Sequence, residues 1–249
     1  MSDTIEAPPT WLAALEVRAV GELALLEMAR PLRALLPRGD GHHVIVLPGF
    51  TADDRSTRPL RRLLDDLGYR SHGWGLGENL GPTAGILRGV RRLVDRTHET
   101  GGAPISVIGW SLGGIFAREL AKEVPEKVRQ VITLASPFTG HPRATNAFRL
   151  YEWMSGHRIG AGDVHEPLRE PPSVPTTSIW SRTDGIVSWR CSVERERRFV
   201  ENIEINASHF GIGAHPLALY AIADRLAQPE GDWRPFHREG WRALAYGEG

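Results

Sequence analysis

A serine between two glycines, at residues 109–113, is the part of the sequence best suited to do chemistry. The segment reads Gly-Trp-Ser-Leu-Gly, and it follows an apolar run at residues 105–108 and opens a helical pattern at residues 112–123. A strand-turn-helix context of this kind forces a sharp, strained turn that lifts the serine hydroxyl above the sheet, and the glycines leave room for strand and helix to approach. Because a chance match in a structural turn would not need this context, Ser111 is the predicted nucleophile.

A serine hydroxyl needs a base, and the base needs a third group to orient it. Asp184 and His209 come shortly after the apolar runs at residues 176–180 and 201–205. The carboxyl ends of parallel strands lie along one edge of a sheet, so these side chains are expected to meet Ser111 there. The chain order Ser, Asp, His also fits a nucleophile turn of this type. We therefore predict His209 as the base and Asp184 as the group that orients it.

Both partners of the serine have a plainer alternative. Asp184 precedes a glycine and could be a turn aspartate that bonds its own backbone. His215 lies six residues beyond His209 and is the rival base. The position of His209 directly after a strand favours it over His215.

Three other segments resemble functional motifs less well. The glycine-rich segment at residues 75–81 has its third glycine one residue too late for a dinucleotide fingerprint, so a loop beside the pocket mouth is favoured. His165 is followed by a glutamate but by no second histidine four residues on, which excludes a metalloprotease motif. Cys191 lies too far past Asp184 to be a nucleophile of this kind and is predicted to be a buried small hydrophobe. We expect neither a metal nor a cofactor.

The elements that must position these side chains alternate along the chain from residue 43 onward. Short apolar runs predict strands at residues 43–47, 69–74, 105–108, 128–135, 176–180 and 201–205. Helical patterns separate them at residues 57–67, 82–98, 112–123 and 216–227. This alternation is typical of an α/β fold in which helices cover both faces of a mostly parallel sheet.

One connection is too long for a simple crossover. Residues 137–175 separate the fourth strand from the fifth, and connections of this length are commonly functional lids. The segment holds an apolar cluster that could roof a pocket, although a helix that only caps the core is an equal alternative: Phe148, Leu150, Tyr151, Trp153 and Met154. Trp153, in this helical lid insertion, and Trp110, beside the nucleophile, are the predicted substrate-binding residues.

The two ends of the chain flank the predicted core at residues 39–228. Within residues 1–38, apolar side chains recur at helical spacing among charged ones, which indicates an amphipathic helix: Leu12, Leu15, Ala19, Leu23 and Leu26. Packing on the domain is favoured over dimerisation or contact with a membrane surface. Residues 229–249 are predicted to form a strap over the surface.

Composition excludes several classes of protein. The 249 residues suit one large domain, and 30 basic residues balance 30 acidic ones, so the net positive field of a nucleic-acid binder is missing. One cysteine cannot form an internal disulfide. Charges interrupt the apolar stretch at residues 11–28, so we expect no signal peptide and no integral membrane segment, and a cytoplasmic location. Peripheral membrane contact and oligomeric state stay open.

Taken together, the serine turn, the Asp-Gly-Ile-Val segment and the Ser-His pair resemble the α/β-hydrolase superfamily, in particular its lipase and esterase branch, over residues 44–226. The resemblance implies an oxyanion hole made by the backbone N–H groups of Leu112 and Phe50, although Pro-Gly replaces the common His-Gly before Phe50. It also implies a serine hydrolase that cleaves a small-molecule carboxylic ester through an acyl-enzyme. The aromatic residues of the predicted lid and Trp110 favour an ester with a lipophilic acyl part. An acyltransferase with the same triad and a catalytically inactive binding protein of the same fold are the alternatives.

Overall fold

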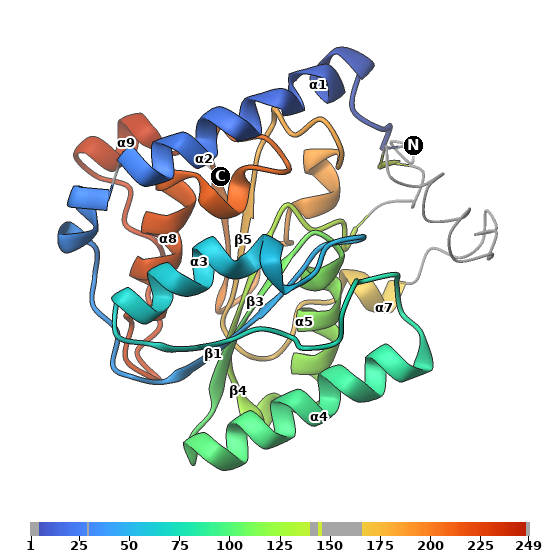
Figure 1. The fold of residues 1–249 in the computed structure, drawn as a ribbon, viewed down its shortest axis with the longest axis vertical. Coiled ribbons are helices and arrows are strands. Elements are labelled where there is room, and N and C mark those ends of the chain that lie inside the picture. The colour runs from blue at the N-terminus through green and yellow to red at the C-terminus, as the bar shows by residue number, and fades with distance from the viewer. Residues whose placement is uncertain (1–4, 29, 140–143, 146–165, 248–249) are drawn as a thin grey trace.

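The computed structural model of the chain describes residues 5–28, 30–139, 144–145 and 166–247. A six-stranded sheet runs through the centre of the molecule in the order β2-β1-β3-β4-β5-β6, and every neighbouring pair is parallel (Figure 1). The strands are β1 His43–Leu47, β2 Arg70–His72, β3 Ile105–Trp110, β4 Val128–Leu134, β5 Thr176–Trp180 and β6 Val200–Glu204. The strand order reverses between β1 and β3. Sites in open α/β sheets form beside the carboxyl ends of such strands.

Four helices cover the two faces of the sheet. They are α3 Asp54–Asp66, α4 Ala84–Gly101, α5 Leu112–Glu123 and α8 Pro216–Leu226. Side chains of α3 and α8 pack into one apolar cluster with the strands, and side chains of α4 and α5 pack into a second. The predicted fold class, a parallel sheet with helices on both faces, is therefore confirmed.

The remaining described elements are short or lie near the ends of the chain. They are α1 Thr10–Ala14, η1 Leu15–Arg18, α2 Ala19–Met28, η2 Arg30–Leu35, η3 Pro125–Lys127, α7 Glu166–Arg169, η5 Trp189–Ser192, η6 Ile212–Ala214 and α9 Trp241–Ala245. Among the described residues, none of the helices has the length and apolar character that a membrane span needs.

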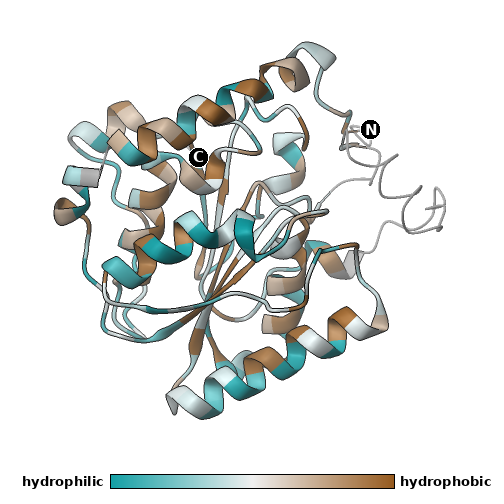
Figure 2. Ribbon diagram, in the orientation of Figure 1, coloured by the Kyte–Doolittle hydropathy of each residue, from teal (hydrophilic) through white to brown (hydrophobic). Residues whose placement is uncertain are grey.

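Burial explains why these segments fold as they do. Figure 2 shows that hydrophobic residues predominate along the strands, whereas α3 and α4 alternate between hydrophobic and hydrophilic positions. All five residues of β1 and of β5 are buried, as a strand covered on both faces requires. Capping side chains begin α3 and α4: Asp53 accepts the N–H of Arg55 before α3, and Thr83 accepts that of Ile86 before α4.

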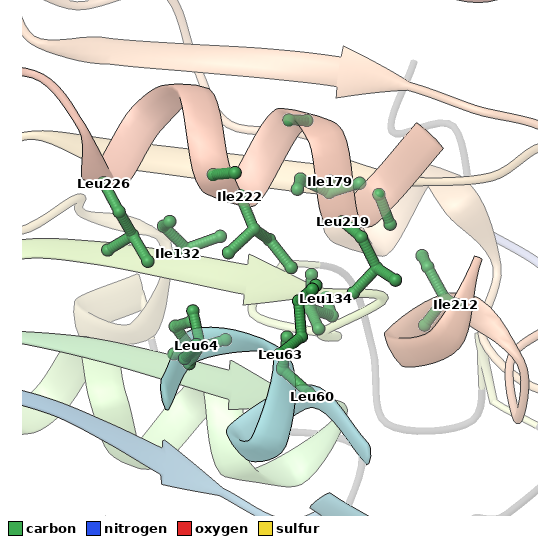
Figure 3. Close-up of a cluster of buried hydrophobic side chains, with 14 of the residues drawn as sticks. Leu60, Leu63, Leu64, Ile132, Leu134, Ile179, Ile212, Leu219, Ile222 and Leu226 are labelled. Atoms are coloured by element: carbon green, nitrogen blue, oxygen red, sulfur yellow. The ribbon is translucent and has the colours of Figure 1, made fainter. Parts of the chain in front are cut away.

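The larger apolar cluster fills the space between α3, α8 and the middle of the sheet (Figure 3). Leu63 and Leu64 of α3, Ile132 of β4, and Leu219 and Ile222 of α8 are among its side chains. Burying each such side chain fully contributes about 1.5–3 kcal/mol relative to leaving it in water. This packing fixes the strand ends from which the candidate site is built.

The strand β2 is shorter than the sequence predicts. It ends at His72 because the next backbone N–H groups turn away from the sheet: those of Trp74 and Gly75 both donate to the carboxylate of Asp54, at 2.8 and 2.9 Å. The strand β3, in contrast, continues two residues further than predicted, through Trp110, directly up to the serine.

The N-terminal helices do not bury the apolar stripe that the sequence suggested. Leu12 and Leu26 are buried, but Leu15 and Leu23 are 44% and 45% exposed. The same helices instead bury two carboxylates, those of Glu16 and Glu22. The prediction of a simple apolar face was therefore wrong, and the reason lies in the hydrogen bonds that these carboxylates accept.

Most of the predicted lid at residues 137–175, including Trp153 and the rest of its apolar cluster, lies outside the described residues. The described part returns to the core at α7, where the guanidinium of Arg118 donates to the carbonyl oxygens of Leu168 and Glu170, each at 3.1 Å. In the predicted C-terminal strap, Phe236 and Tyr246 are buried against the cluster that contains α8.

Candidate active site

Ser111 occupies the turn between β3 and α5 with strained backbone angles, φ 51° and ψ −121°. A positive φ is uncommon for a residue with a Cβ and persists only where the surrounding structure enforces it. Here the N–H of Ser111 donates to the carbonyl oxygen of Leu134 at 2.8 Å, which ties the turn to β4. The strain therefore belongs to a turn that the neighbouring strand holds in place.

Two glycines make this turn possible. A Cβ at Gly109 would lie 2.3 Å from the carbonyl oxygen of Gly113, and a Cβ at Gly113 would lie 2.5 Å from that of Leu47. Both obstacles are backbone atoms, which cannot move aside as a flexible side chain can. The glycines that surround the serine in the sequence are therefore explained by the close approach of β1, β3 and α5.

The structure brings the three residues predicted from the sequence together. Nε2 of His209 lies 3.1 Å from Oγ of Ser111, and Nδ1 of His209 lies 2.8 Å from Oδ2 of Asp184. All three side chains are buried or nearly so. With Asp184 ionised, Nδ1 carries the proton and donates it, which leaves Nε2 as an acceptor for the serine hydroxyl. This is the arrangement in which an imidazole can remove the proton of a nucleophile.

Asp184 also makes the turn contacts of the alternative interpretation. Its Oδ1 accepts the N–H groups of Ile186 and Val187, each at 2.8 Å. The turn and the contact with His209 are thus made by one carboxylate, because each oxygen serves a different partner. The two interpretations do not exclude each other.

The groups around His209 raise the pKa of its ring. Burial by itself lowers the pKa of the imidazole, but the charge and hydrogen bond of Asp184, together with the charge of Glu16, outweigh it. The pKa of His209 is therefore raised above its ordinary value. A base that becomes positively charged during the reaction is stabilised by such neighbours.

The rival histidine has a different task in the fold. His215 is the residue before α8, and its Nδ1 accepts the N–H of Leu217 at 3.3 Å. Burial lowers the pKa of this ring. His215 thus caps a helix, and His209 is the histidine whose ring nitrogen reaches Ser111.

The fold around this site is shared with known hydrolases. No protein-family model matches the sequence. Lipase B of Aspergillus fumigatus superposes with a TM-score of 0.57 at 19% identity, over 76% of this chain and 53% of the lipase. The chain thus spans about half the length of that lipase. A monoacylglycerol lipase of Paleococcus ferrophilus gives 0.57 at 16% identity, over 77% and 96% of the two chains. An α/β superfamily hydrolase of Oenococcus oeni superposes with a TM-score of 0.54 at 15% identity, over 75% of this chain and 91% of that hydrolase.

The chain has the α/β-hydrolase fold. This agrees with the resemblance seen in the sequence, and at these identities it concerns the architecture alone.

The two residues predicted to supply the oxyanion donors both belong to segments that lie beside Ser111. Leu112 is the first residue of α5, so its N–H is among those at a helix start that have no acceptor within the helix. The loop that carries Phe50 runs beside the serine, since a Cβ at Gly49 would lie 3.3 Å from Cβ of Ser111. The assignment of Phe50 and Leu112 as oxyanion donors stays a prediction.

Sequence reasoning did not find the side chain that braces this loop. Asn79 is fully buried. Its side-chain Nδ2 donates to the carbonyl oxygen of Pro48 at 2.9 Å, and its backbone carbonyl oxygen accepts the N–H of Thr51 at 2.8 Å. Asn79 belongs to the glycine-rich segment at residues 75–81, which was predicted to be a loop near the pocket mouth. The signal that the sequence offered was an asparagine between glycines.

The indole of Trp110 contacts the base loop. Its Nε1 donates to the carbonyl oxygen of His209 at 3.1 Å, and the two rings lie 6.1 Å apart. Trp110 therefore helps to hold the loop that carries the base, a contact that the sequence did not reveal. Its predicted role in binding substrate stays a prediction, as does that of Trp153.

The other motifs do not join the site. Cys191 is a buried free cysteine, and burial raises the pKa of its thiol to about 12. His165 lies outside the described residues. Within the described part of the chain, no group of three or more histidine, cysteine or acidic side chains is arranged to hold a metal ion.

Proposed function

We propose that this protein is a serine hydrolase that cleaves carboxylic esters with a lipophilic acyl part. The observation that carries the proposal is the unbroken hydrogen-bonded path from Oγ of Ser111 through the ring of His209 to Asp184. This path supplies a nucleophile, a base and a group that fixes the tautomer of the base. The backbone N–H groups at the start of α5, directly after the serine turn, add electrostatic stabilisation where negative charge develops.

In the proposed mechanism, Oγ of Ser111 attacks the ester carbonyl while Nε2 of His209 takes the hydroxyl proton. The N–H groups of Leu112 and Phe50 donate to the oxyanion of the tetrahedral intermediate. The intermediate collapses as His209 returns the proton to the leaving alcohol, which leaves an acyl-enzyme on Ser111. Water, deprotonated by His209, attacks this ester and releases the carboxylic acid and the free serine.

The proposed preference for lipophilic esters rests on apolar groups near the base and on the aromatic composition of residues 146–165. Phe210 directly follows the base and is 55% exposed, with its ring 5.7 Å from that of His209. Two structural neighbours are named as lipases. A panel of p-nitrophenyl esters with increasing acyl length measures this preference, and a kcat/KM that does not rise with chain length would contradict it.

Active-site labelling tests the reaction class directly. A fluorophosphonate should label the wild-type protein on the peptide that contains Ser111, as read by mass spectrometry. Ser111→Ala should abolish the label, and His209→Ala should strongly slow it. No label, or a label that is undiminished in His209→Ala, would favour the catalytically inactive binding protein.

Product analysis separates hydrolysis from acyl transfer. Both reactions share the acyl-enzyme, and only the second nucleophile differs. The proposal expects free acid as the main product when a short alcohol competes with water. Predominant transfer to the alcohol at low concentration would favour the acyltransferase.

A further inference from the structure

The N-terminal helical segment lies across the two loops that carry the predicted acid and base. Figure 1 shows α1 and α2 running along one side of the molecule, next to the segments that follow β5 and β6. Gly185 in the acid loop packs so closely on this segment that a Cβ there would lie 2.3 Å from the carbonyl oxygen of Leu12. In the base loop, Gly211 is similarly close, because a Cβ there would overlap the carboxylate of Glu22.

A single buried carboxylate, that of Glu16, joins these two loops. Its Oε1 accepts the N–H of Gly185 at 2.8 Å and the N–H of His209 at 3.0 Å, and its Oε2 accepts the N–H of Phe210 at 3.1 Å. Gly185 follows the acid directly, and the other two donors are the base residue and its successor. Glu16 therefore links the backbone of the acid loop to the backbone of the base itself.

Two neighbouring side chains fasten the same loops from the same segment. The guanidinium of Arg18 donates to the carbonyl oxygen and the hydroxyl of Thr183, the residue before the acid, at 2.6 and 2.7 Å. The carboxylate of Glu22 accepts the N–H and the hydroxyl of Ser208, the residue before the base. Glu16 differs from both because it is the one that contacts the two loops together.

These contacts explain why the segment buries glutamates and exposes leucines. A buried carboxylate is costly unless hydrogen bonds satisfy it, and three backbone donors do so for Glu16, which is 7% exposed. The donors depend equally on the carboxylate, since a buried N–H without an acceptor costs about 1–3 kcal/mol. The polar loops beneath the segment therefore determine its buried face together with the two buried leucines, Leu12 and Leu26.

We propose that Glu16 is a positioning residue of the active site, which fixes the acid loop and the base loop relative to each other. This inference rests on the proposed function, because it assigns the residue that keeps the side chains of the predicted triad aligned. Catalysis is sensitive to such alignment, and a displacement of about 1 Å can lower the rate by about a hundredfold.

The charge of Glu16 has a second consequence. The charged groups that bear on the His209 ring are Asp184, from the loop after β5, and Glu16, from the N-terminal segment, and both raise its pKa against the effect of burial. Glu22 and Arg18 act instead on His215. Removing the charge of Glu16 should therefore lower the pKa of His209, whereas removing that of Glu22 should not.

The matched pair Glu16→Gln and Glu22→Gln tests the proposal in the full-length protein. Each change keeps the size of a buried side chain and removes its charge. In Glu16→Gln the new amide N–H must face a backbone N–H, because all three partners of Glu16 are backbone donors. In Glu22→Gln the new amide N–H can donate to the hydroxyl of Ser208, which rotates to accept it. We expect Glu16→Gln to lower kcat at least tenfold with little change in KM. The NMR titration of the His209 ring, assigned with His209→Ala, should move to lower pH in Glu16→Gln and stay in place in Glu22→Gln. Thermal unfolding of both variants reports any general loss of stability.

A Glu16→Gln protein with kcat within about twofold of wild type and an unmoved His209 titration would overturn the proposal. Equal effects of the two variants on kcat and on the titration would also overturn it, because they would indicate a general structural role. If Glu16→Gln does not fold, Glu16→Asp replaces it. This change keeps the charge but shortens the side chain by one methylene, so the carboxylate no longer reaches the N–H groups of both loops. The proposal then expects a lower kcat, and an unchanged kcat in Glu16→Asp rejects it.

The failure of the proposed function would be visible separately. A wild-type protein that takes no fluorophosphonate label on Ser111 and cleaves no ester would not be the proposed hydrolase. The NMR titration needs no turnover, so it would still show whether Glu16 acts on His209.

Discussion

Asp184 holds His209 with one carboxylate oxygen and its own loop with the other. Oδ2 lies 2.8 Å from Nδ1 of His209, and Oδ1 accepts the N–H groups of Ile186 and Val187 at the same distance. The backbone donors prevent the carboxylate from turning, so the orientation of the imidazole is set by the loop. The position of the base therefore depends on the conformation of residues 184–187.

We expect Asp184→Asn to lower kcat by about 10⁴, by analogy with other triads. An asparagine can still accept the two backbone N–H groups, so the loop should persist. Its amide N–H would then donate to Nδ1, so the ring proton would lie on Nε2. A protonated Nε2 cannot accept the proton of Ser111. Steady-state kinetics with a p-nitrophenyl ester measure the loss.

The control for this substitution is Asp95→Asn. Asp95 of α4 forms ion pairs with Arg91 and with Lys127 of η3, and none of these residues belongs to the candidate site. This variant should retain the wild-type kcat. Full activity in Asp184→Asn would transfer the orienting role to another residue.

The pH profile should reflect the raised pKa of His209. The ring must be neutral to accept the serine proton, so kcat/KM should rise with pH through the pKa of His209 in the free enzyme. Since Asp184 and Glu16 raise this pKa against the effect of burial, the acidic limb should lie above the ordinary histidine value of about 6.5. A stopped assay of ester cleavage across the pH range locates the midpoint. A midpoint below that value would show that burial, which favours the neutral ring, prevails.

The sequence predicted the sheet and the three meeting side chains because both follow from local patterns. Apolar runs that are buried on both faces stand out, so the expected strands at residues 43–47 and 176–180 match β1 and β5 residue for residue. Parallel pairing then places all carboxyl ends at one edge, which brings Ser111, Asp184 and His209 into reach without any knowledge of side-chain contacts.

The parts that the sequence did not reveal depend on polar contacts between distant segments. Apolar periodicity predicts which face of a helix is buried, but Glu16 and Glu22 are buried to satisfy backbone donors some 170–190 residues away. The brace of Asn79 on Pro48 has the same character. No local pattern contains such a pairing. The division into helix, core and strap, the lid and the cytoplasmic location stay predictions.

Gly113→Ala should destabilise the fold and reduce activity. The new Cβ would lie 2.5 Å from the carbonyl oxygen of Leu47 and 2.6 Å from that of Pro48, so β1 and α5 would have to separate. We expect a loss of about 2 kcal/mol or more in the free energy of unfolding, measured with urea. The same displacement would move the serine turn away from the loop of Phe50.

Gly85→Ala is the matched control for this change. Gly85 is exposed in the first turn of α4, and the nearest atom to a new Cβ would be Oγ1 of Thr83, at 3.8 Å. Alanine in a helix is favoured over glycine by about 0.5–1 kcal/mol, so this variant should be as stable as wild type or slightly more stable. Equal destabilisation by the two alanines would contradict the role of close packing at Gly113.

A buried ion pair joins the nucleophile helix to the loop before β6. Arg118 of α5 pairs with Glu194, and neither side chain is exposed to solvent. The guanidinium also lies over the ring of Phe138, 3.9 Å from its centroid, and bonds the backbone of the returning segment at Leu168. Removing one partner would leave the other charge buried without compensation.

Glu194→Leu and Arg118→Met should therefore each lower the free energy of unfolding by about 3–5 kcal/mol. The double variant should lose much less than the sum, because neither charge then remains buried alone. A urea-unfolding double-mutant cycle measures this coupling, which for residues in contact reaches about 0.5–3 kcal/mol. If the two losses simply add, the pair contributes no interaction, and the apolar packing of α5, which includes Phe116 and Leu120, then carries more of its position.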